Sequence, residues 1–177
     1  SVHWCAGSEA EIERLNEMMV ADGSLVRLDR EKHPNRFYAR SDVNDVARVE
    51  DRTFICSTEE ADAWPTKHWK SPADMQALVD PLFEGGMQGR TLYVVPYLMG
   101  PPGSPMSKVG IEITDSPYVV ANMRIMTRMG QVALDELGDD GTFVKGLHST
   151  GNLDPTQRYI CHFPDENLIM SFSSNYG

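Results

Sequence analysis

A long β-type run in the middle of the chain constrains the fold more than any other feature of the sequence. Residues 90–100 read RTLYVVPYLMG, and Pro96 interrupts the run. Because proline cannot donate a hydrogen bond to a β-ladder, it favours a sheet edge or a bulge at this point. After a loop rich in proline and glycine, residues 108–114 (KVGIEIT) alternate between polar and branched apolar side chains. The centre of the chain therefore predicts two long strands.

Helix signals and shorter β-type runs surround this centre. Ser8 can cap a first helix, with Glu11 as its capping-box partner three residues later and Gly23 at its end. Similar signals predict helices that begin at Asp42, Ser71 and Ser116 and end near Glu50, Gly85 and Met129, with a short helix at residues 132–137. Further strands are expected at residues 25–28, 37–39, 53–56 (buried), 143–148, 158–162 and 168–172. Because the two kinds of element mix without strict alternation, we expect an α/β domain with a mixed β-sheet flanked by helices.

Charge and cysteine content exclude several classes of partner. The 177 residues carry 16 basic and 26 acidic side chains, a net charge of −10. Such a charge argues against binding nucleic acid or an anionic membrane by bulk attraction, so we expect neither partner. No apolar run approaches the roughly 20 residues of a membrane span, and the first residues do not form a secretory signal. Three cysteines without a CxxC pair indicate reduced thiols in a cytoplasmic protein.

Motifs for nucleotide and metal chemistry are missing from the sequence. No lysine follows a glycine, so no phosphate-binding loop of the G-x-x-x-x-G-K-[ST] type is present. The five histidines are scattered, although His148 and His162 lie on expected strands and could approach each other. Because no spacing of metal ligands supports a site, we expect structural histidines and no metal site within this chain.

Two segments are candidates for contact with an anionic ligand. Arg48 lies among small apolar residues, so its guanidinium must find an anion or reach water; an internal salt bridge to Asp45 or Glu50 is the alternative. The final residues 173–177 (SSNYG) predict either a turn whose backbone N–H groups face a ligand or an ordinary loop. Arg124 and Arg128, four residues apart on an expected helix, favour structural pairing with a carboxylate.

Four stretches of the chain together resemble the N-terminal part of the GTP-dependent phosphoenolpyruvate carboxykinases. They read SDVNDVARVEDRTFICS, GRTLYVVPYLMGPPGSPMSKVGIEITDSPYVVANMRIMTRMG, FVKGLHSTG and the terminal SNYG. The resemblance runs in order from about Gly7 to Gly177, and residues 89–130 are its most specific part. It implies that residues 1–177 form an incomplete N-terminal, substrate-side domain and that the nucleotide- and metal-binding domain lies beyond them. The absence of an initiator methionine and of a helix stop or polar tail at the end also predicts a segment cut from something longer.

The resemblance also implies a reaction. Members of this family reversibly convert oxaloacetate and GTP to phosphoenolpyruvate, carbon dioxide and GDP, which is a step of gluconeogenesis and anaplerosis. They use Mn²⁺ at the active site and Mg²⁺ with the nucleotide, and a monomer is the state that the family suggests. Decarboxylation leaves an enolate whose oxygen attacks the γ-phosphoryl group. Since the family's metal ligands and nucleotide pocket would lie beyond Gly177, we expect the 177-residue segment alone to be inactive.

Three residues match the family's substrate-binding positions. Arg48 matches the arginine of the D-V-A-R motif, and Tyr176 and Gly177 match the substrate loop, where many relatives carry a glycine just before the tyrosine. A guanidinium fork suits carboxylate or phosphate oxygens, and a tyrosine ring edge suits a carboxylate. No catalytic residue of the family falls within the segment. The alternatives are a stand-alone, non-catalytic anion-binding or scaffold domain of the same fold, and, less favoured, a relative that uses ATP or pyrophosphate.

Overall fold

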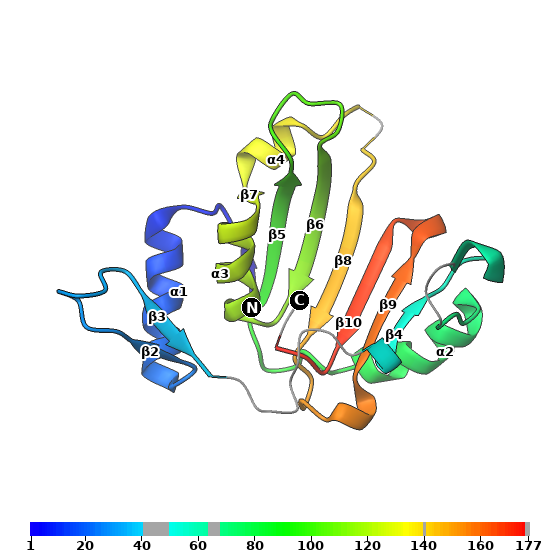
Figure 1. Cartoon of the computed structure of the whole chain (residues 1–177), viewed down its shortest axis with the longest axis horizontal. Coiled ribbons are helices and arrows are strands. Elements are labelled where there is room, and N and C mark those ends of the chain that lie inside the picture. Colours follow the sequence, from blue (N-terminus) through cyan, green and yellow to red (C-terminus); the bar gives the residue numbers. More distant parts are fainter. Residues whose placement is uncertain (41–49, 64–67, 140, 176–177) are drawn as a thin grey trace.

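The computed structural model describes residues 1–40, 50–63, 68–139 and 141–175 (Figure 1). Within these residues, eight strands form one sheet in the order β1-β5-β6-β8-β10-β9-β4, with β7 paired to β5. The strands are β1 (Val2–Trp4), β4 (Thr53–Ile55), β5 (Leu92–Met99), β6 (Lys108–Thr114), β7 (Arg128–Met129), β8 (Val144–Ser149), β9 (Tyr159–Phe163) and β10 (Leu168–Phe172). The sheet contains both kinds of strand pair. Strand β5 is antiparallel to β6 and β9 is antiparallel to β10, whereas the pairs β1–β5, β6–β8, β8–β10 and β4–β9 are parallel, so the expected mixed α/β sheet is confirmed.

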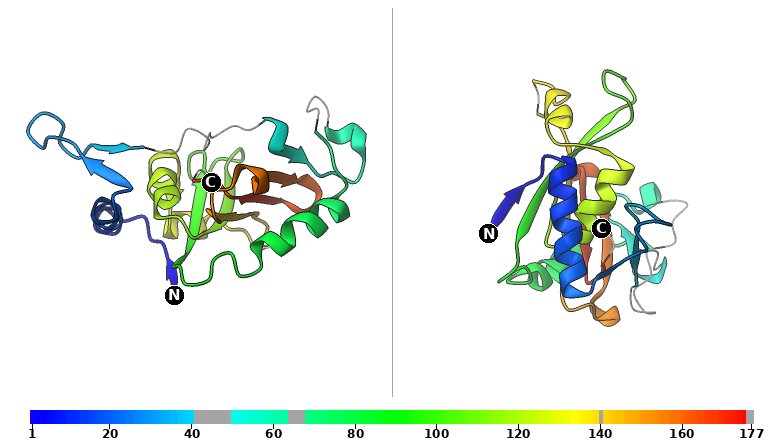
Figure 2. Two further views of the ribbon diagram at one scale, coloured as in Figure 1. Left: turned by 90° about the horizontal axis from the view of Figure 1, so that it is seen from below. Right: turned by 90° about the vertical axis from the view of Figure 1, so that its left-hand side faces the viewer.

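Helices cover both faces of this sheet (Figure 2). The helices are α1 (Glu9–Asp22), α2 (Pro72–Phe83), α3 (Pro117–Met126) and α4 (Gln131–Asp135), and the short 3-10 turns are η1 (Glu50–Arg52), η2 (Glu60–Ala63), η3 (Pro155–Gln157) and η4 (Pro164–Glu166). A separate hairpin of β2 (Leu25–Arg27) and β3 (Phe37–Ala39) projects beside α1. Of the helices in the described ranges, none is both long and apolar enough to cross a membrane.

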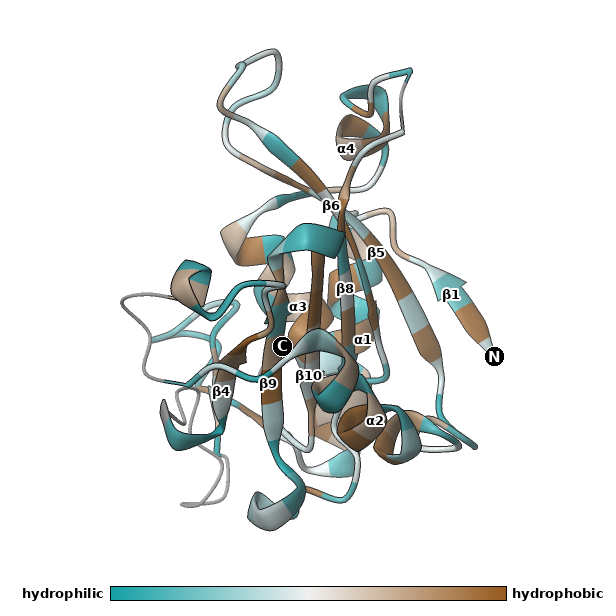
Figure 3. Cartoon of the chain, turned by 90° about the vertical axis from the view of Figure 1, so that its right-hand side faces the viewer, coloured by the Kyte–Doolittle hydropathy of each residue, from teal (hydrophilic) through white to brown (hydrophobic). Residues whose placement is uncertain are grey.

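Two apolar cores form on opposite faces of the sheet. Helices α1 and α3 pack on β5 through one core, which consists of Cys5, Leu15, Met19, Leu25, Tyr93, Val95, Val120 and Met129. Helix α2 packs on β9 and β10 through the other core, which consists of Cys56, Met75, Val79, Cys161, Phe163 and Met170. Figure 3 shows how apolar residues concentrate on the central strands and on α2, whereas the loops are largely hydrophilic.

Local sequence signals explain where most elements begin and end. Ser8 caps α1, since its Oγ accepts from the backbone N–H of Glu11 at 3.2 Å, and Gly23 ends the helix at a φ of 84°. The expected strand at residues 53–56 forms as β4, but it is only half-buried because β4 lies at the edge of the sheet. The helix expected at residues 42–50 lies outside the described residues, apart from Glu50 in η1.

Pro96 lies inside the sheet and not on its edge strand, which corrects one expectation. Strand β5 pairs with β6 along one side. Along its other side, β1 pairs with Leu92–Val94 and β7 pairs with Tyr97–Leu98. Pro96 therefore lies between the end of β1 and the start of β7. No partner strand needs an N–H from it there, so the missing donor costs little free energy. Its carbonyl still accepts from the N–H of Gly130 at 2.9 Å.

The helix expected to run to about Met129 ends earlier. Helix α3 stops at Met126, and Thr127 caps it through a hydrogen bond from its Oγ1 to the carbonyl of Met123. Arg128 and Met129 then form β7, whose Met129 side chain joins the core beside β5. Pairing with β5 outweighs the local helical pattern, which the sequence alone could not indicate.

Candidate substrate-side site

The three residues predicted to bind substrate are not among those that the structure describes. Arg48, Tyr176 and Gly177 all lie outside the described residues, so their roles stay predictions. The described part of the chain does include the backbone that leads directly to Tyr176, residues Ser173–Asn175. The candidate site can therefore be built from the framework that fixes this backbone.

The carboxyl ends of three strands meet at one edge of the sheet (Figure 1). Strands β6, β8 and β10 are mutually parallel, since β8 pairs parallel with both of the others. Their ends place Asp115, Thr150 and Ser173 along this edge, which we call the carboxyl edge. Ligands of open α/β sheets bind beyond the carboxyl ends of the strands. The terminal loop thus leaves the sheet at the position where a ligand site is expected.

Two buried side chains hold the backbone of this loop. His148 on β8 is 0% exposed, and its Nε2 donates to the carbonyl of Ser174 at 2.7 Å. Because a carbonyl only accepts, Nε2 carries a ring proton, and Nδ1 shares a hydrogen bond of 2.7 Å with the Thr114 hydroxyl. Arg158 is 2% exposed, and its Nε donates to the carbonyl of Ser173 at 2.8 Å. Two buried side chains therefore hold the consecutive carbonyls of Ser173 and Ser174 in place.

Ser173 adopts a backbone conformation that needs such support. Its φ of 64° lies in the left-handed region, which is uncommon for a residue other than glycine. Its N–H donates to the carbonyl of Ser149 at 2.9 Å, and its hydroxyl donates to the carbonyl of Asp154 at 3.0 Å. These contacts turn the chain sharply at the end of β10 and set the direction in which it continues toward Tyr176.

A second buried network joins the other two loops of the carboxyl edge. The Asp115 carboxylate accepts from the Ser149 hydroxyl at 2.7 Å, the Thr150 N–H at 2.9 Å and the Arg90 guanidinium at 2.7 Å. Burial raises the pKa of this carboxyl, but the hydrogen bonds and the Arg90 charge outweigh burial and hold the pKa below its ordinary value. Arg90 also donates to the carbonyl of Gly151 at 2.6 Å, so the loops after β6 and β8 are tied together.

A largely apolar groove of different chemistry also lies among the described residues. It has a volume of about 600 Å³ and lies between α3 and the sheet, lined by Tyr97, Glu112, Asn122, Met126, His162 and Ile169 among others. Burial raises the pKa of Glu112 to about 8 and lowers the pKa of His162. Both groups therefore favour their neutral forms, and this groove offers no cation to an anionic substrate.

The arginine pair and the histidine pair considered from the sequence do not form sites. Arg124 on α3 donates to the carbonyl of Gly7, and Arg128 on β7 donates to the carbonyl of Gly100, so the expected pairing with carboxylates is wrong. His148 and His162 lie on strands separated by β10, and both ring nitrogens of His148 are already engaged.

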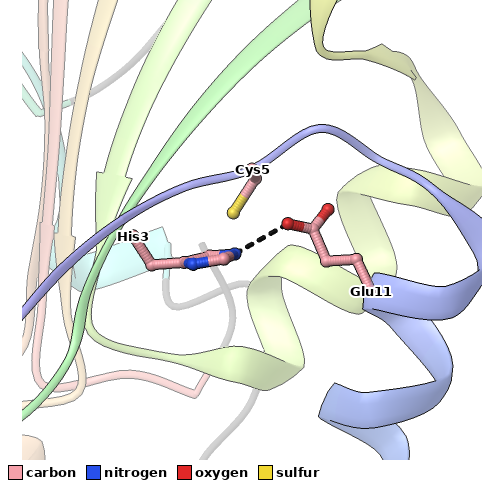
Figure 4. Close-up of side chains that lie close together, drawn as sticks. All are labelled: His3, Cys5 and Glu11. Atoms are coloured by element: carbon pink, nitrogen blue, oxygen red, sulfur yellow. Dashed lines mark hydrogen bonds and ion pairs between the residues drawn. The ribbon is translucent and has the colours of Figure 1, made fainter.

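Sequence reasoning missed one group of metal-ligand residues. Within the described residues, His3, Cys5 and Glu11 form the one group of this kind that could hold a metal ion (Figure 4). The His-x-Cys spacing, followed six residues later by the capping glutamate, is the signal that could have suggested it.

Comparisons with known proteins agree with the architecture. The family model described as phosphoenolpyruvate carboxykinase N-terminal domain matches residues 1–177. Proteins named phosphoenolpyruvate carboxykinase (GTP) from Anaeromyxobacter dehalogenans (strain 2CP-C) and Corynebacterium jeikeium (strain K411) are each 53% identical over 99% and 100% of this chain, and 30% and 31% of their own lengths. The same-named protein of Chlamydia pneumoniae is 48% identical over 99% of this chain and 31% of its own length.

These matches show which family the chain belongs to and how much of the relatives' length it covers. The chain spans about 30% of the length of the curated relatives that it matches, and the alignments leave almost none of the chain uncovered. The family model covers every residue, so the whole of the mixed sheet lies within the matched domain. The chain belongs to the phosphoenolpyruvate carboxykinase N-terminal domain family.

Proposed function

We propose that this chain is the substrate-side part of a GTP-dependent phosphoenolpyruvate carboxykinase, a carboxy-lyase. The whole enzyme would be a cytoplasmic monomer that reversibly converts oxaloacetate and GTP to phosphoenolpyruvate, carbon dioxide and GDP. Support comes from relatives of that name that are 53% identical to this chain. Residues beyond Gly177 would bind GTP with Mg²⁺ and the catalytic Mn²⁺.

The observation that carries the proposal is the anchored loop at the carboxyl edge. His148 and Arg158 fix the carbonyls of Ser174 and Ser173, and the chain then continues to Tyr176 and Gly177. Ser173 and Ser174, held in this way, would lose little conformational freedom when a substrate binds. We assign Tyr176 and Gly177 to the substrate carboxylate, with the tyrosine ring edge facing it, and Arg48 to an anionic group of oxaloacetate or phosphoenolpyruvate.

The residues described at the carboxyl edge do not fit a catalytic Mn²⁺ ion. The carboxylate of Asp115 already accepts several hydrogen bonds, and both ring nitrogens of His148 are engaged. The Arg90 guanidinium, 2.7 Å from the Asp115 carboxylate, also places a positive charge where a cation would have to bind. We therefore route no step through a metal here, and the role of this part of the chain is to bind and orient the substrate.

Replacing Arg48 in the full-length enzyme tests the proposal. Arg48→Ala removes a charge-assisted contact and should cost roughly 2–3 kcal/mol, or about 30- to 150-fold in kcat/KM for oxaloacetate and phosphoenolpyruvate. The affinity for GDP should stay nearly unchanged. Arg30→Ala, which removes an exposed arginine of the β2–β3 loop, is the matched control. A kcat/KM within threefold of wild type would make Arg48 a structural salt-bridge partner only.

A second pair of variants tests the assignment of Tyr176. A ring-edge contact needs the aromatic ring more than the hydroxyl, so Tyr176→Phe should be mild and Tyr176→Ala should weaken substrate binding by roughly 1 kcal/mol. The KM for phosphoenolpyruvate and the melting temperature are measured on both full-length variants. If alanine lowers only the melting temperature, the tyrosine merely packs the loop; if both variants lose binding equally, the hydroxyl is the group in contact.

A further inference from the structure

Three side chains with different ligand atoms converge where the first strand meets the first helix (Figure 4). His3 belongs to β1, Cys5 follows that strand, and Glu11 lies in the first turn of α1. A ring nitrogen, the thiol sulfur and a carboxylate oxygen all lie within 4.8 Å of one another. His3 Nε2 and Glu11 Oε1 are 2.7 Å apart, so they form a hydrogen bond in which the ring donates.

The backbone that carries these side chains is firmly placed. His3 pairs with Tyr93 of β5, and the N–H of Cys5 donates to the carbonyl of Val94 at 2.8 Å. The Glu11 carboxylate accepts from the N–H of Gly7 at 2.7 Å, which fixes the helix start against the turn. The Tyr93 ring meets the His3 ring edge-on, with centroids 5.9 Å apart. Ligand atoms held by a sheet, a turn and a helix are preorganised.

Of the three side chains, Cys5 is the one whose ligand atom makes no hydrogen bond to another described residue. The residue is 3% exposed, and no hydrogen bond to its sulfur is formed by residues within the described ranges. Burial, together with the nearby Glu11 charge, raises the pKa of the thiol to about 12. Without a cation the thiol therefore stays protonated and unreactive, next to a carboxylate that attracts a cation.

We propose that His3, Cys5 and Glu11 bind a borderline-soft divalent transition metal such as Zn²⁺, in a site separate from the chemistry of the carboxyl edge. Sulfur, imidazole and carboxylate together suit Zn²⁺ or Co²⁺ and do not suit Mg²⁺ or Ca²⁺. The ligand atoms of a tetrahedral Zn²⁺ ion lie about 3.4–3.6 Å apart, so movements of these three side chains by about 1 Å would bring their ligand atoms to coordination distance.

Charge and protons balance when the ion enters. The ion takes the place of the proton that His3 Nε2 donates to Glu11, and in the neutral imidazole this proton moves to Nδ1, so the ring itself releases none. The thiol of Cys5 loses its proton to solvent, so one proton is released for each ion bound. Thiolate and carboxylate then neutralise the two positive charges. The His3 side chain is 37% exposed, which leaves water as the fourth ligand. The ion would pin β1 to α1.

Cobalt is the probe for this site in the full-length, metal-stripped protein. A Co²⁺–thiolate bond gives a charge-transfer band in the near ultraviolet, which oxygen and nitrogen ligands do not give. Wild type should show this band, Zn²⁺ should displace it, and Cys5→Ser should lose it. His3→Gln should bind Co²⁺ at least about 10-fold more weakly. Cys161→Ser, at a buried cysteine in the other core, is the matched control and should keep the band.

A second measurement keeps the test decisive if Cys5→Ser fails to fold. Because His3 is partly exposed, His3→Gln should fold, which circular dichroism checks. Zn²⁺ should raise the melting temperature of wild type and of Cys161→Ser by more than that of His3→Gln, since only the site at His3 is lost in that variant. The proposal is overturned if wild type gives no cobalt–thiolate band, if Cys5→Ser keeps the full band, or if Zn²⁺ stabilises His3→Gln as much as wild type.

Discussion

Buried polar side chains at the carboxyl edge each serve more than one loop. The His148 ring links Thr114 at the end of β6 to Ser174 after β10, and Asp115 links Arg90 to the loop after β8. Buried groups of this kind stabilise a structure only while their partners are in place, because an unpaired buried donor or acceptor costs its full desolvation free energy. Substitution of one such residue should therefore affect several segments.

Replacement of His148 should show this coupling. His148→Ala removes the donor to the Ser174 carbonyl and the hydrogen-bond partner of the Thr114 hydroxyl, so the free energy of unfolding should fall by about 2–4 kcal/mol. His148→Gln, which can still donate near the Nε2 position, should recover part of the loss. Urea denaturation measures both variants, with the exposed His33→Ala as control. Equal stability of His148→Ala and wild type would contradict the anchoring role.

Glu112 should give stability an unusual dependence on pH. Burial raises the pKa of its folded-state carboxyl from 4.5 to about 8, so between these values the folded chain holds a proton that the unfolded chain releases. The free energy of unfolding therefore falls as pH rises through this window. Glu112→Gln should stabilise the chain more at pH 8 than at pH 5, by at least about 1.4 kcal/mol, the equivalent of one pKa unit.

Chemical denaturation of the 177-residue chain at the two pH values measures this difference. Glu13→Gln, at an exposed position of α1, is the control and should show no pH-dependent gain. A gain of Glu112→Gln that is the same at both pH values would mean that the carboxyl is ionised in the folded chain at neutral pH.

At the scale of elements, close packing of β5 on β6 depends on a glycine. Tyr97 lies opposite Gly110 in the antiparallel register, and its ring covers the glycine. A Cβ atom built on Gly110 would lie 2.2 Å from Cζ of Tyr97. No side chain fits at that position unless the ring moves, so this strand glycine marks a close approach and not a break in the strand.

A double-mutant cycle tests this contact. Gly110→Ala should lower the free energy of unfolding by about 1–3 kcal/mol, because the Tyr97 ring must leave its rotamer. In a Tyr97→Ala background the same change meets no ring, so most of the cost should vanish and leave a coupling energy of about 1–3 kcal/mol. Thermal or urea unfolding of the four proteins provides the values. A cost that persists without the ring would place the strain in the backbone instead.

At the scale of the whole molecule, the chain covers about 30% of the length of its relatives. The segment has no glycine-lysine phosphate loop in its sequence. We therefore predict that the isolated 177-residue chain shows no carboxykinase activity, since its sequence lacks the loop that would hold the triphosphate for transfer. A coupled assay with GTP, Mn²⁺ and oxaloacetate checks this, with the full-length enzyme as positive control. Turnover above a metal-only control would contradict the prediction.

Much of the element pattern was predictable because its causes are local. The Ser8 cap joins atoms three residues apart, and the alternation of Lys108–Thr114 follows from the two-residue period of a strand. The ranges expected for β3, β6 and β10 match the structure residue for residue. The family was also predictable, since the motif strings that carry the resemblance are contiguous in the sequence.

Only the tertiary structure decided which distant residues meet. It turned Arg128 and Met129 from an expected helix into β7, and it brought His148 to Ser174 and Cys5 to His3 and Glu11. The assignments of Arg48 and Tyr176 still rest on resemblance. These outcomes depend on strand order and on packing between segments far apart in the chain. Such contacts form only when burial of the two cores outweighs the entropy lost in closing long loops, and no local sequence pattern contains that information.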